Sequence, residues 1–550
     1  MFVGYFPMKK IMYAVIILAL AVVVLIQISC YNSSYSDTYD VLIKDGLVYD
    51  GSTSEPMVED VGIKGDKIVA VGKNLAGAAS RIINAEGLIV TPGFIDVHNH
   101  TDLNILMAWI QSGKWGDLSI LTPEWKNNQN YSTQGVTTIV TGLCGGGFFD
   151  TIEWLRLIYS TKFRCNVYHL IPYGMFRNLL FGDNQPGKLN AQQLESLKYL
   201  VEKEMQNGAI GVSVGLEYAP DCNTTPDELV EIAKVVNKYG GLYDAHIRNQ
   251  TGTDKDGLPG VLNAIKETIK IAKRADIPVH ISHIQLNLPW GNDRWGNVQA
   301  KQMYGLIEQA RADGVDITAD QHPYDQGYGI VSYRLPDKFK TSTGVKEKYK
   351  TPEGKAEMKK EAIKIFEDFD LGPDKIKIIS GDEKYVNKTI AEIASDPKDP
   401  KDPADVYVDQ CCLEPAPYAL FNEINDQINR EIMTHDYVFT ASDGFTVFAP
   451  ADSPHPRFFG CFPYKIRKYA LEEKLMTLND AIRSMTSLPA AKFKLKGRGM
   501  IAVGNYADIA VIDLNKLKQN ADYDHRGVYS EGVMYLLLNG TLSIDQGKLN

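Results

Sequence analysis

The sequence has few cysteines and no strongly basic region. These two features argue against a protein built on a disulfide framework and against a nucleic-acid-binding protein. Its seven cysteines among 550 residues are irregularly spaced and form no Cys-x-x-Cys pair, so a disulfide framework is not expected. The chain has 58 Lys and Arg against 68 Asp and Glu, a net charge of −10. That balance argues against a nucleic-acid partner, which would need a basic face. No block of like charge is long enough to form an interaction tail.

Only one long apolar run is present, and it lies at the N-terminus. Met8-Lys9-Lys10 precedes an almost unbroken apolar stretch from Ile11 to Ile28, and Ser29-Cys30 follows it. A basic start, an apolar core and a small residue at the exit are typical of an export signal. Cys30 is placed like the lipidated cysteine of a bacterial lipoprotein, and an uncleaved membrane anchor is the alternative. Both interpretations predict an exported protein of the cell envelope or periplasm, tethered to a membrane through residues 1–30.

The middle of the chain alternates apolar, strand-like runs with helical ones. Such an alternation predicts an α/β fold, namely a (β/α)₈ barrel of the TIM type. Helices are expected at Ala191–Asn207, Pro226–Tyr239, Gly260–Ala275 and Val298–Asp313. The strand-like runs end at His98/His100, Cys144, His169, Glu217, His246, His283, Tyr324 and Asp443. Because the C-terminal ends of barrel strands form the active site of this fold, these residues are the candidates for chemistry.

Two further units complete the predicted architecture around a barrel of residues 91–497. Residues 39–90 and 498–550 contain short β-rich runs, so we expect both chain ends to join in one small β-sandwich domain. Residues 336–428 are rich in Lys and Asp and too long for an ordinary βα loop. They predict an inserted subdomain before the last barrel strand, near the mouth of the site.

The most informative motif is His98-Asn99-His100, which ends the apolar run from Leu88 to Val97. On a strand, positions i and i+2 point the same way, so both imidazoles can reach one metal ion. Four more strand-end residues offer ligand atoms: Cys144, His246, His283 and Asp443. Each has an ordinary alternative when taken alone, as a buried free cysteine, a core histidine or a turn aspartate. A barrel would bring all of them to one point, which favours a metal site.

These motifs together resemble the amidohydrolase superfamily, and specifically its D-aminoacylase (N-acyl-D-amino-acid deacylase) branch. The resemblance extends from Asp40 to the C-terminus. Cys144 stands where hydantoinase-like relatives have a carboxylated lysine. The other motifs that carry the resemblance are the runs 91–100, 208–216, 246–248, 281–283, 319–321, 442–444 and 455–457.

The resemblance implies a zinc-dependent hydrolase that acts on a small-molecule N-acyl-D-amino acid. A tight zinc would be held by Cys144, His246 and His283. A second, weaker zinc would be held by His98, His100 and Asp443. In the implied mechanism, zinc-bound hydroxide attacks the amide carbonyl, and Asp443 is the catalytic proton shuttle. Arg457 would grip the α-carboxylate of the substrate with its guanidinium fork.

The predicted substrate contacts depart from the family pattern. His322-Pro323-Tyr324 stands where the family often has Tyr-Pro-Tyr, so His322 would replace the tyrosine expected at the carboxylate. Tyr324 is a further substrate-binding candidate. The alternatives are a dipeptidase or cyclic-amide hydrolase of the same superfamily, and an inactive, membrane-tethered binding protein. The cysteine at position 144 argues against the hydantoinase type, and the complete ligand set argues against an inactive barrel. Nothing in the sequence specifies an oligomeric state.

Overall fold

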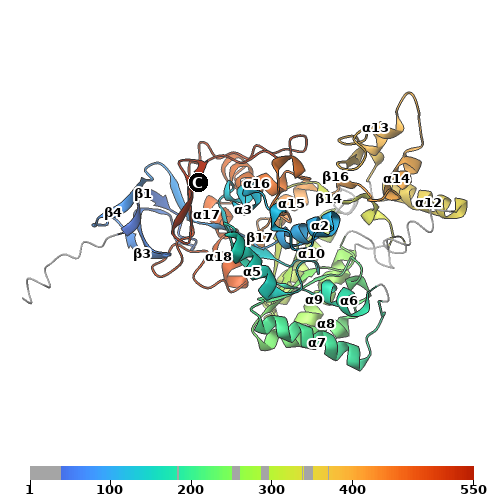
Figure 1. Cartoon of the computed structure of the whole chain (residues 1–550), viewed down its shortest axis with the longest axis horizontal. Coiled ribbons are helices and arrows are strands. Elements are labelled where there is room, and N and C mark those ends of the chain that lie inside the picture. Colours follow the sequence, from blue (N-terminus) through green and yellow to red (C-terminus); the bar gives the residue numbers. More distant parts are fainter. Residues whose placement is uncertain are drawn as a thin grey trace, which may run out of the picture.

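The computed structural model describes residues 39–182, 185–250, 260–285, 296–336, 339, 351–368 and 371–550. The segment 1–30, predicted to be an export signal or anchor, lies outside these residues. Among the described residues, no helix has the length and apolar character needed to cross a membrane. Figure 1 shows a sheet at one end of the molecule, a barrel in the middle and a third unit at the other end.

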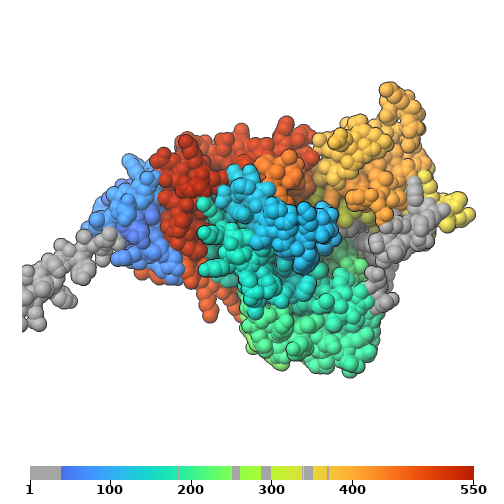
Figure 2. All heavy atoms as spheres, viewed as in Figure 1, coloured from blue at the N-terminus to red at the C-terminus, as the bar shows by residue number. Residues whose placement is uncertain are grey.

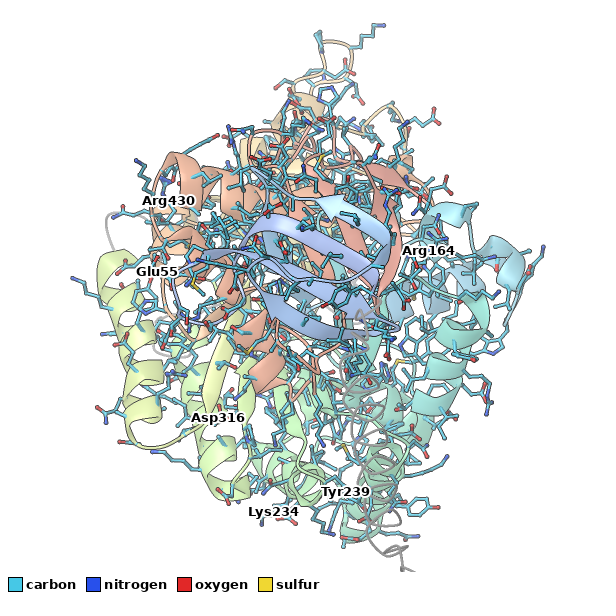
Figure 3. All side chains as sticks on the ribbon, turned by 90° about the vertical axis from the view of Figure 1, so that its left-hand side faces the viewer. Glu55, Arg164, Lys234, Tyr239, Asp316 and Arg430 are labelled. Carbon is cyan, nitrogen blue, oxygen red and sulfur yellow. The ribbon has the colours of Figure 1, made fainter. Side chains whose placement is uncertain are left out.

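Both ends of the chain meet, as predicted, in one β domain, which is built from a single sheet of nine strands. Strand β1 pairs with β4 along its first half and with β5 at its end, and β5 also pairs with β18 near the C-terminus. Apolar residues from both chain ends, such as Ile43 and Val511, therefore share one core. Figure 3 looks onto the blue N-terminal strands of this end sheet. The strands are β1 (Tyr39–Val48), β2 (Met57–Lys64), β3 (Lys67–Gly72), β4 (Ala79–Asn84), β5 (Ile89–Pro92), β18 (Ile509–Ile512), β19 (Val533–Leu538), β20 (Thr541–Asp545) and β21 (Lys548–Leu549).

Parallel strands at eight positions form the predicted barrel. The third position is shared by β8 and β9, because β8 pairs with β7 and β9 with β10. The circle closes between its last and first strands through the bridge Asn99↔Gly444. Asp96 reinforces this closure by accepting hydrogen bonds from the N–H and Oγ of Ser442 at 2.9 and 2.5 Å. The strands are β6 (Phe94–Asp96), β7 (Val136–Thr141), β8 (Asn166–His169), β9 (Ile171–Pro172), β10 (Gly211–Gly215), β11 (Leu242–His246), β12 (Val279–Ile281), β13 (Ile317–Gln321) and β17 (Val438–Thr440).

Helices cover the outside of the barrel where the apolar spacing predicts them. In α8 (Pro226–Lys238), Thr225 and Glu228 form a capping box, and proline occupies the first helical position. Its buried residues recur at helical spacing and pack on the barrel core. The other predicted helices are α7 (Ala191–Gln206), α9 (Gly260–Ala275) and α10 (Gly296–Ala312).

The run from Leu88 to Val97 is not one strand, which corrects the basis of the His-x-His prediction. Gly93 divides it into β5, in the end sheet, and β6, in the barrel. A Cβ at Gly93 would lie 2.2 Å from Thr137 Oγ1, so glycine is needed where the chain crosses between the two sheets. Both histidines follow the end of β6, so the turn after the strand, and not strand alternation, orients their rings.

Residues between β13 and β17 form a unit with its own apolar core. Its antiparallel sheet has the order β14-β16-β15, and Val331 and Tyr407 are among the residues buried under it. The sheet begins at β14, ahead of the predicted start at residue 336, while α15 (Asp426–Ile432) packs on the barrel core instead. The elements of this unit are β14 (Gly327–Ile330), α12 (Pro352–Asp368), β15 (Ile376–Ile378), α13 (Ile390–Ala394), α14 (Pro403–Cys411) and β16 (Tyr418–Phe421).

The direction of the barrel follows from these connections. Because β5 leads directly into β6, the N-terminal ends of the barrel strands face the end sheet. The inserted unit leaves from the C-terminal end of β13, and Figure 1 accordingly places it on the side away from the end sheet. The candidate site therefore opens on the face that the inserted unit borders.

Candidate metal centre

Residues from five barrel strand ends meet at one point. The Sγ atom of Cys144 lies 3.4 Å from His98 Nε2 and 3.6 Å from His283 Nε2. It lies 3.8 Å from His246 Nδ1, which is itself 2.8 Å from His283 Nε2. The donor atoms form two overlapping sets, and within each set they lie within 4.8 Å of one another. One set is His98, His100 and Cys144, and the other is Cys144, His246 and His283. The thiol belongs to both sets. The structure thus brings the predicted ligands together, with the thiol between the two sets.

Asp443, at the end of the last barrel strand, completes the cluster. Its Oδ1 lies 3.2 Å from His100 Nε2 and 3.6 Å from His98 Nε2. Its Oδ2 forms an ion pair of 2.9 Å with Arg457 Nη2. Burial opposes ionisation, but the Arg457 guanidinium and His100 hold the pKa of Asp443 well below its usual value. The carboxylate is therefore charged, and one of its oxygens faces the histidines.

Three cluster residues adopt left-handed backbone conformations. The φ angles are 52° at Cys144, 33° at His283 and 47° at Asp443. Non-glycine residues adopt such angles at a cost of about 1–3 kcal/mol, and strained residues of this kind are enriched at active sites. Each of the three follows the end of its strand, where the turn aims its side chain at the common point.

The electrostatics of the cluster favour positive charge at its centre. Burial raises the pKa of the Cys144 thiol, but the neighbouring histidines outweigh burial and bring it well below its usual value. Burial likewise opposes protonation of the imidazoles, yet the thiolate and carboxylates raise the pKa of His98 well above normal. They raise the pKa of His100 and of His246 to about 9. A bound divalent cation would supply the positive charge that these anionic groups attract.

The donor chemistry fits zinc. Zn²⁺ binds cysteine sulfur, histidine nitrogen and carboxylate oxygen, and this cluster offers one thiol, four imidazoles and one carboxylate. Hard cations such as Mg²⁺ prefer all-oxygen sites, so a thiolate shared between both donor sets argues against them.

The outer nitrogens of three cluster histidines have partners, of which only Glu217 was among the predicted strand-end residues. His98 Nδ1 lies 3.3 Å from Asp320 Oδ2, and His246 Nε2 lies 3.1 Å from Glu217 Oε2. His283 Nδ1 lies 3.2 Å from Gln250 Nε2. Such partners fix the orientation of a ligand ring. The signal for Asp320 and Glu217 was present in the sequence as an acidic residue in or just after a buried strand.

Below the cluster, Asp320 also binds His280. The distance from His280 Nε2 to Asp320 Oδ2 is 3.0 Å, and His280 Nδ1 lies 2.7 Å from Thr318 Oγ1. Asp244 lies in the same buried group. Because both ring nitrogens of His280 are engaged there, this histidine stands apart from the metal cluster.

Of the three predicted substrate-binding residues, two lie beside the cluster. Arg457 Nη1 is 3.1 Å from His322 Nε2, and both side chains are buried. Tyr324 is placed differently: its ring stacks on Tyr464, and its hydroxyl lies 3.5 Å from the carbonyl oxygen of Pro456. Packing against Tyr464 holds the ring of Tyr324, and its contact with substrate stays a prediction.

Comparisons with known proteins identify the family. Two family models, both described as the amidohydrolase family, match residues 89–261 and 430–543. The chain is 28% identical over 536 residues to the D-aminoacylase of Alcaligenes xylosoxydans xylosoxydans, covering 92% of this chain and 95% of that protein. It is also 28% identical over 524 residues to the N-acyl-D-glutamate deacylase of the same organism, covering 91% and 93%.

A solved structure has the same fold. It is the N-acyl-D-glutamate deacylase of Bordetella bronchiseptica, complexed with zinc and a phosphonate inhibitor that mimics the tetrahedral intermediate. The TM-score is 0.74 at 24% sequence identity, and the alignment covers 93% of this chain and 98% of that chain. The similarity is therefore not confined to the barrel.

Proposed function

Because this chain belongs to the D-aminoacylase branch of the amidohydrolase superfamily, we propose that it is a zinc-dependent amide hydrolase that releases free amino acids from N-acyl-D-amino acids. The observation that carries the proposal is the buried cluster of one thiol, four imidazoles and one carboxylate at the barrel mouth. An arginine at the edge of this cluster supplies a site for the substrate carboxylate.

The donor set of Cys144, His246 and His283, and the contacts of Asp443 with His98 and His100, suggest which residues hold the metal. Cys144, His246 and His283 would bind the tighter zinc, and His98, His100 and Asp443 would line a second, weaker position. Zn²⁺, when bound, acts as a Lewis acid that polarises the amide carbonyl and acidifies water.

Asp443 is the proton carrier in this proposal. Its Oδ2 is engaged by Arg457, so Oδ1, which faces His98 and His100, is the oxygen free to take a proton from the attacking water. The same oxygen would then deliver that proton to the leaving amine nitrogen. The low pKa of this carboxyl keeps it charged before the reaction.

Arg457 and His322 together suit the α-carboxylate of the substrate. Burial and the charge of Arg457 lower the pKa of His322 to about 3, so its ring is neutral. Because His322 Nε2 accepts from Arg457 Nη1, the ring proton lies on Nδ1, which is buried and has no partner among the described residues. The Nε of Arg457 is also buried without a partner in the described part of the chain. These two donors would receive carboxylate oxygens.

The test is amine release by the full-length chain from N-acetyl-D- and N-acetyl-L-amino acids. We expect D-selective release, and a fall in kcat of about 10²–10⁴-fold in Asp443→Asn. Asp436→Asn, whose side chain is 74% exposed, is the control and should match wild type. Turnover of dipeptides or cyclic amides alone would contradict the assignment to N-acyl-D-amino acids.

We further propose that the enzyme is exported and tethered to the cell envelope. The support is the sequence of residues 1–30, with its basic start, apolar run and Cys30. Mass spectrometry of the N-terminus should find lipid on Cys30. Release of wild type and Cys30→Ala to the same extent from washed membranes would contradict a lipid tether.

A further inference from the structure

A buried carboxylate lies behind the glycine turn that carries Cys144. Asp221 follows β10, at the start of the short 3₁₀ helix η2 (Asp221–Asn223), and is buried. Its Oδ2 accepts a hydrogen bond of 2.8 Å from the backbone N–H of Gly215, at the end of β10. Its Oδ1 has no hydrogen-bond partner among the described residues. Burying a carboxylate for so few hydrogen bonds costs free energy, so a contribution to stability does not account for this residue.

The carboxylate is in contact with the Cys144 turn itself. A Cβ built at Gly145 would lie 2.2 Å from Asp221 Oδ2. A Cβ built at Gly174, on α6 (Tyr173–Phe181), would lie 2.8 Å from Asp221 Oδ1 and 2.8 Å from the carbonyl oxygen of Gly145. Glycine at these positions lets the carboxylate, the turn and α6 meet closely. In Figure 2 the green segments that carry α6 and α7 form a continuous outer surface at the bottom of the view, and both Gly174 and Asp221 are buried.

The end of β10 connects Asp221 to two of the proposed zinc ligands. A Cβ at Gly215 would lie 2.2 Å from the carbonyl oxygen of Cys144, so the backbones of the strand and the turn are in direct contact. The next residue, Leu216, donates its N–H to the carbonyl oxygen of His246 at 2.9 Å. The hydrogen bond from Gly215 to Asp221 therefore fixes a strand end that contacts both ligand residues.

The turn needs support because its backbone is strained. The φ angle is 52° at Cys144, and a residue of this kind keeps a left-handed conformation only where its surroundings hold it. Ser213 on β10 supplies one contact, because its Oγ accepts the N–H of Gly145 at 3.2 Å. Asp221 supplies a second contact at the same glycine. Starting from the zinc centre of the proposed function, we propose that Asp221 is a positioning residue, which holds Cys144 and His246 at the spacing that the tighter zinc requires.

Removing the carboxylate should weaken the zinc site while every ligand remains. Asp221→Ala leaves the N–H of Gly215 buried without its acceptor and opens a space beside Gly145, so the turn can move. Loss of a residue that supports a metal ligand lowers metal affinity by about 10–100-fold, and we expect a loss in this range for Asp221→Ala.

The conservative variant Asp221→Asn should restore the site. Its amide oxygen can still accept from Gly215, and its size is almost unchanged. Burial raises the pKa of Asp221 to about 7, against the opposing effects of the Gly215 hydrogen bond and of Arg177 and Arg248. Loss of the charge is therefore a small change near neutral pH, and Asp221→Asn should bind zinc nearly as tightly as wild type.

The experiment measures the zinc affinity of the full-length chain by competition with a chelating dye, and the absorption spectrum of the Co²⁺-substituted protein. A thiolate bound to Co²⁺ gives a charge-transfer band in the near ultraviolet, so this band reports on Cys144 directly. Asp221→Ala should lose most of the band at saturating Co²⁺, and Asp221→Asn should keep it. A residue that only stabilises the fold would not change this band.

The matched control is Glu228→Ala. Glu228 on α8 is also a buried carboxylate that accepts backbone hydrogen bonds, but its partners are the N–H groups of Leu189 at 2.7 Å and Thr225 at 3.2 Å, away from the turn. This variant should lower the denaturation midpoint and leave the zinc affinity and the Co²⁺ band unchanged.

The outcomes separate this inference from the proposed function. Zinc affinity of Asp221→Ala equal to wild type, or an equal loss in Glu228→Ala, overturns the positioning role. Asp221→Asn that binds zinc as weakly as Asp221→Ala also overturns it, because an acceptor oxygen would then not be what holds the turn. A metal site that depends on Asp221 in a chain that does not hydrolyse N-acyl-D-amino acids supports the inference and contradicts the proposed substrate. Failure of the wild type to bind zinc removes both.

Discussion

Replacing Asp320 on β13 tests how the metal cluster is held in place. Its buried carboxylate accepts hydrogen bonds from three groups: His98 Nδ1 at 3.3 Å, His280 Nε2 at 3.0 Å and the backbone N–H of His283 at 2.9 Å. Burial disfavours its charge, but His98 and His280 outweigh burial and hold the pKa of Asp320 far below its usual value. One anion therefore positions residues from two different strand ends of the cluster.

Asp320→Asn keeps the shape of the side chain and removes its charge. The amide oxygen can still accept from the backbone of His283, but the amide NH₂ then meets ring nitrogens that need an acceptor. Hydrogen bonds to a charged group contribute about 1.5–3 kcal/mol each, so the loss of two costs about 3–5 kcal/mol of unfolding free energy. Loss of the residue behind a metal ligand lowers metal affinity by about 10–100-fold.

The assays are denaturant unfolding of the metal-free protein and zinc titration against a competing chelator. Because the pKa of Asp320 is depressed on folding, its stabilisation is present above about pH 4 and is lost as the pH falls further. The stability gap between wild type and Asp320→Asn should therefore narrow below about pH 4. Zinc affinity of Asp320→Asn within twofold of wild type would refute the positioning role, while the exposed control Asp436→Asn should match wild type.

Three further predictions follow from single contacts. Arg457→Lys replaces the forked guanidinium by a single ammonium group, so steady-state kinetics should show at least a tenfold rise in KM for N-acetyl-D-amino acids. An equal rise in KM for an amide substrate without a carboxylate would contradict the assigned contact. Tyr324→Phe removes a hydroxyl whose partner is the carbonyl oxygen of Pro456 at 3.5 Å, so kcat/KM should change less than twofold, and a larger loss would mean that the hydroxyl meets substrate. Burial lowers the pKa of Lys465 to about 8, with Ser484 Oγ as its partner at 3.0 Å. Lys465→Met should therefore be more stable than wild type by about 3 kcal/mol at pH 7, and this gain should vanish as the pH rises from 8 to 10.5. Denaturation midpoints measured at pH 7 and at pH 10.5 test this prediction.

The barrel and its ligands were predictable because each ligand terminates a strand-like run. In a parallel barrel all C-terminal strand ends lie on one face, so strand-end residues such as Cys144 and Asp443 converge whatever the details of the register. The partners behind them were not predictable in the same way. His98 and Asp320 are separated by 222 positions in the chain, and only the folded barrel brings them within hydrogen-bonding distance.

The reasoning about His98-Asn99-His100 gave the wrong cause for a convergence that the structure shows, while the substrate role of Tyr324 stays a prediction. Strand alternation was inferred from neighbours in the sequence, but contacts made elsewhere in the fold set the orientation of the two rings. Strand β5 belongs to the end sheet, and the barrel strand β6 begins only after Gly93. The two histidines therefore lie in the turn that follows β6. Tyr324 stacks on Tyr464, which belongs to a distant helix.

The most direct test of the account is the zinc content of the full-length chain, measured together with its amide hydrolysis before and after chelation. The account predicts at least one zinc per chain, loss of hydrolysis on chelation and recovery on adding zinc. It also predicts that Cys144→Ala loses both the metal and the activity, because the thiol belongs to both donor sets. Full zinc occupancy in Cys144→Ala, or hydrolysis that persists in the metal-free wild type, would contradict it.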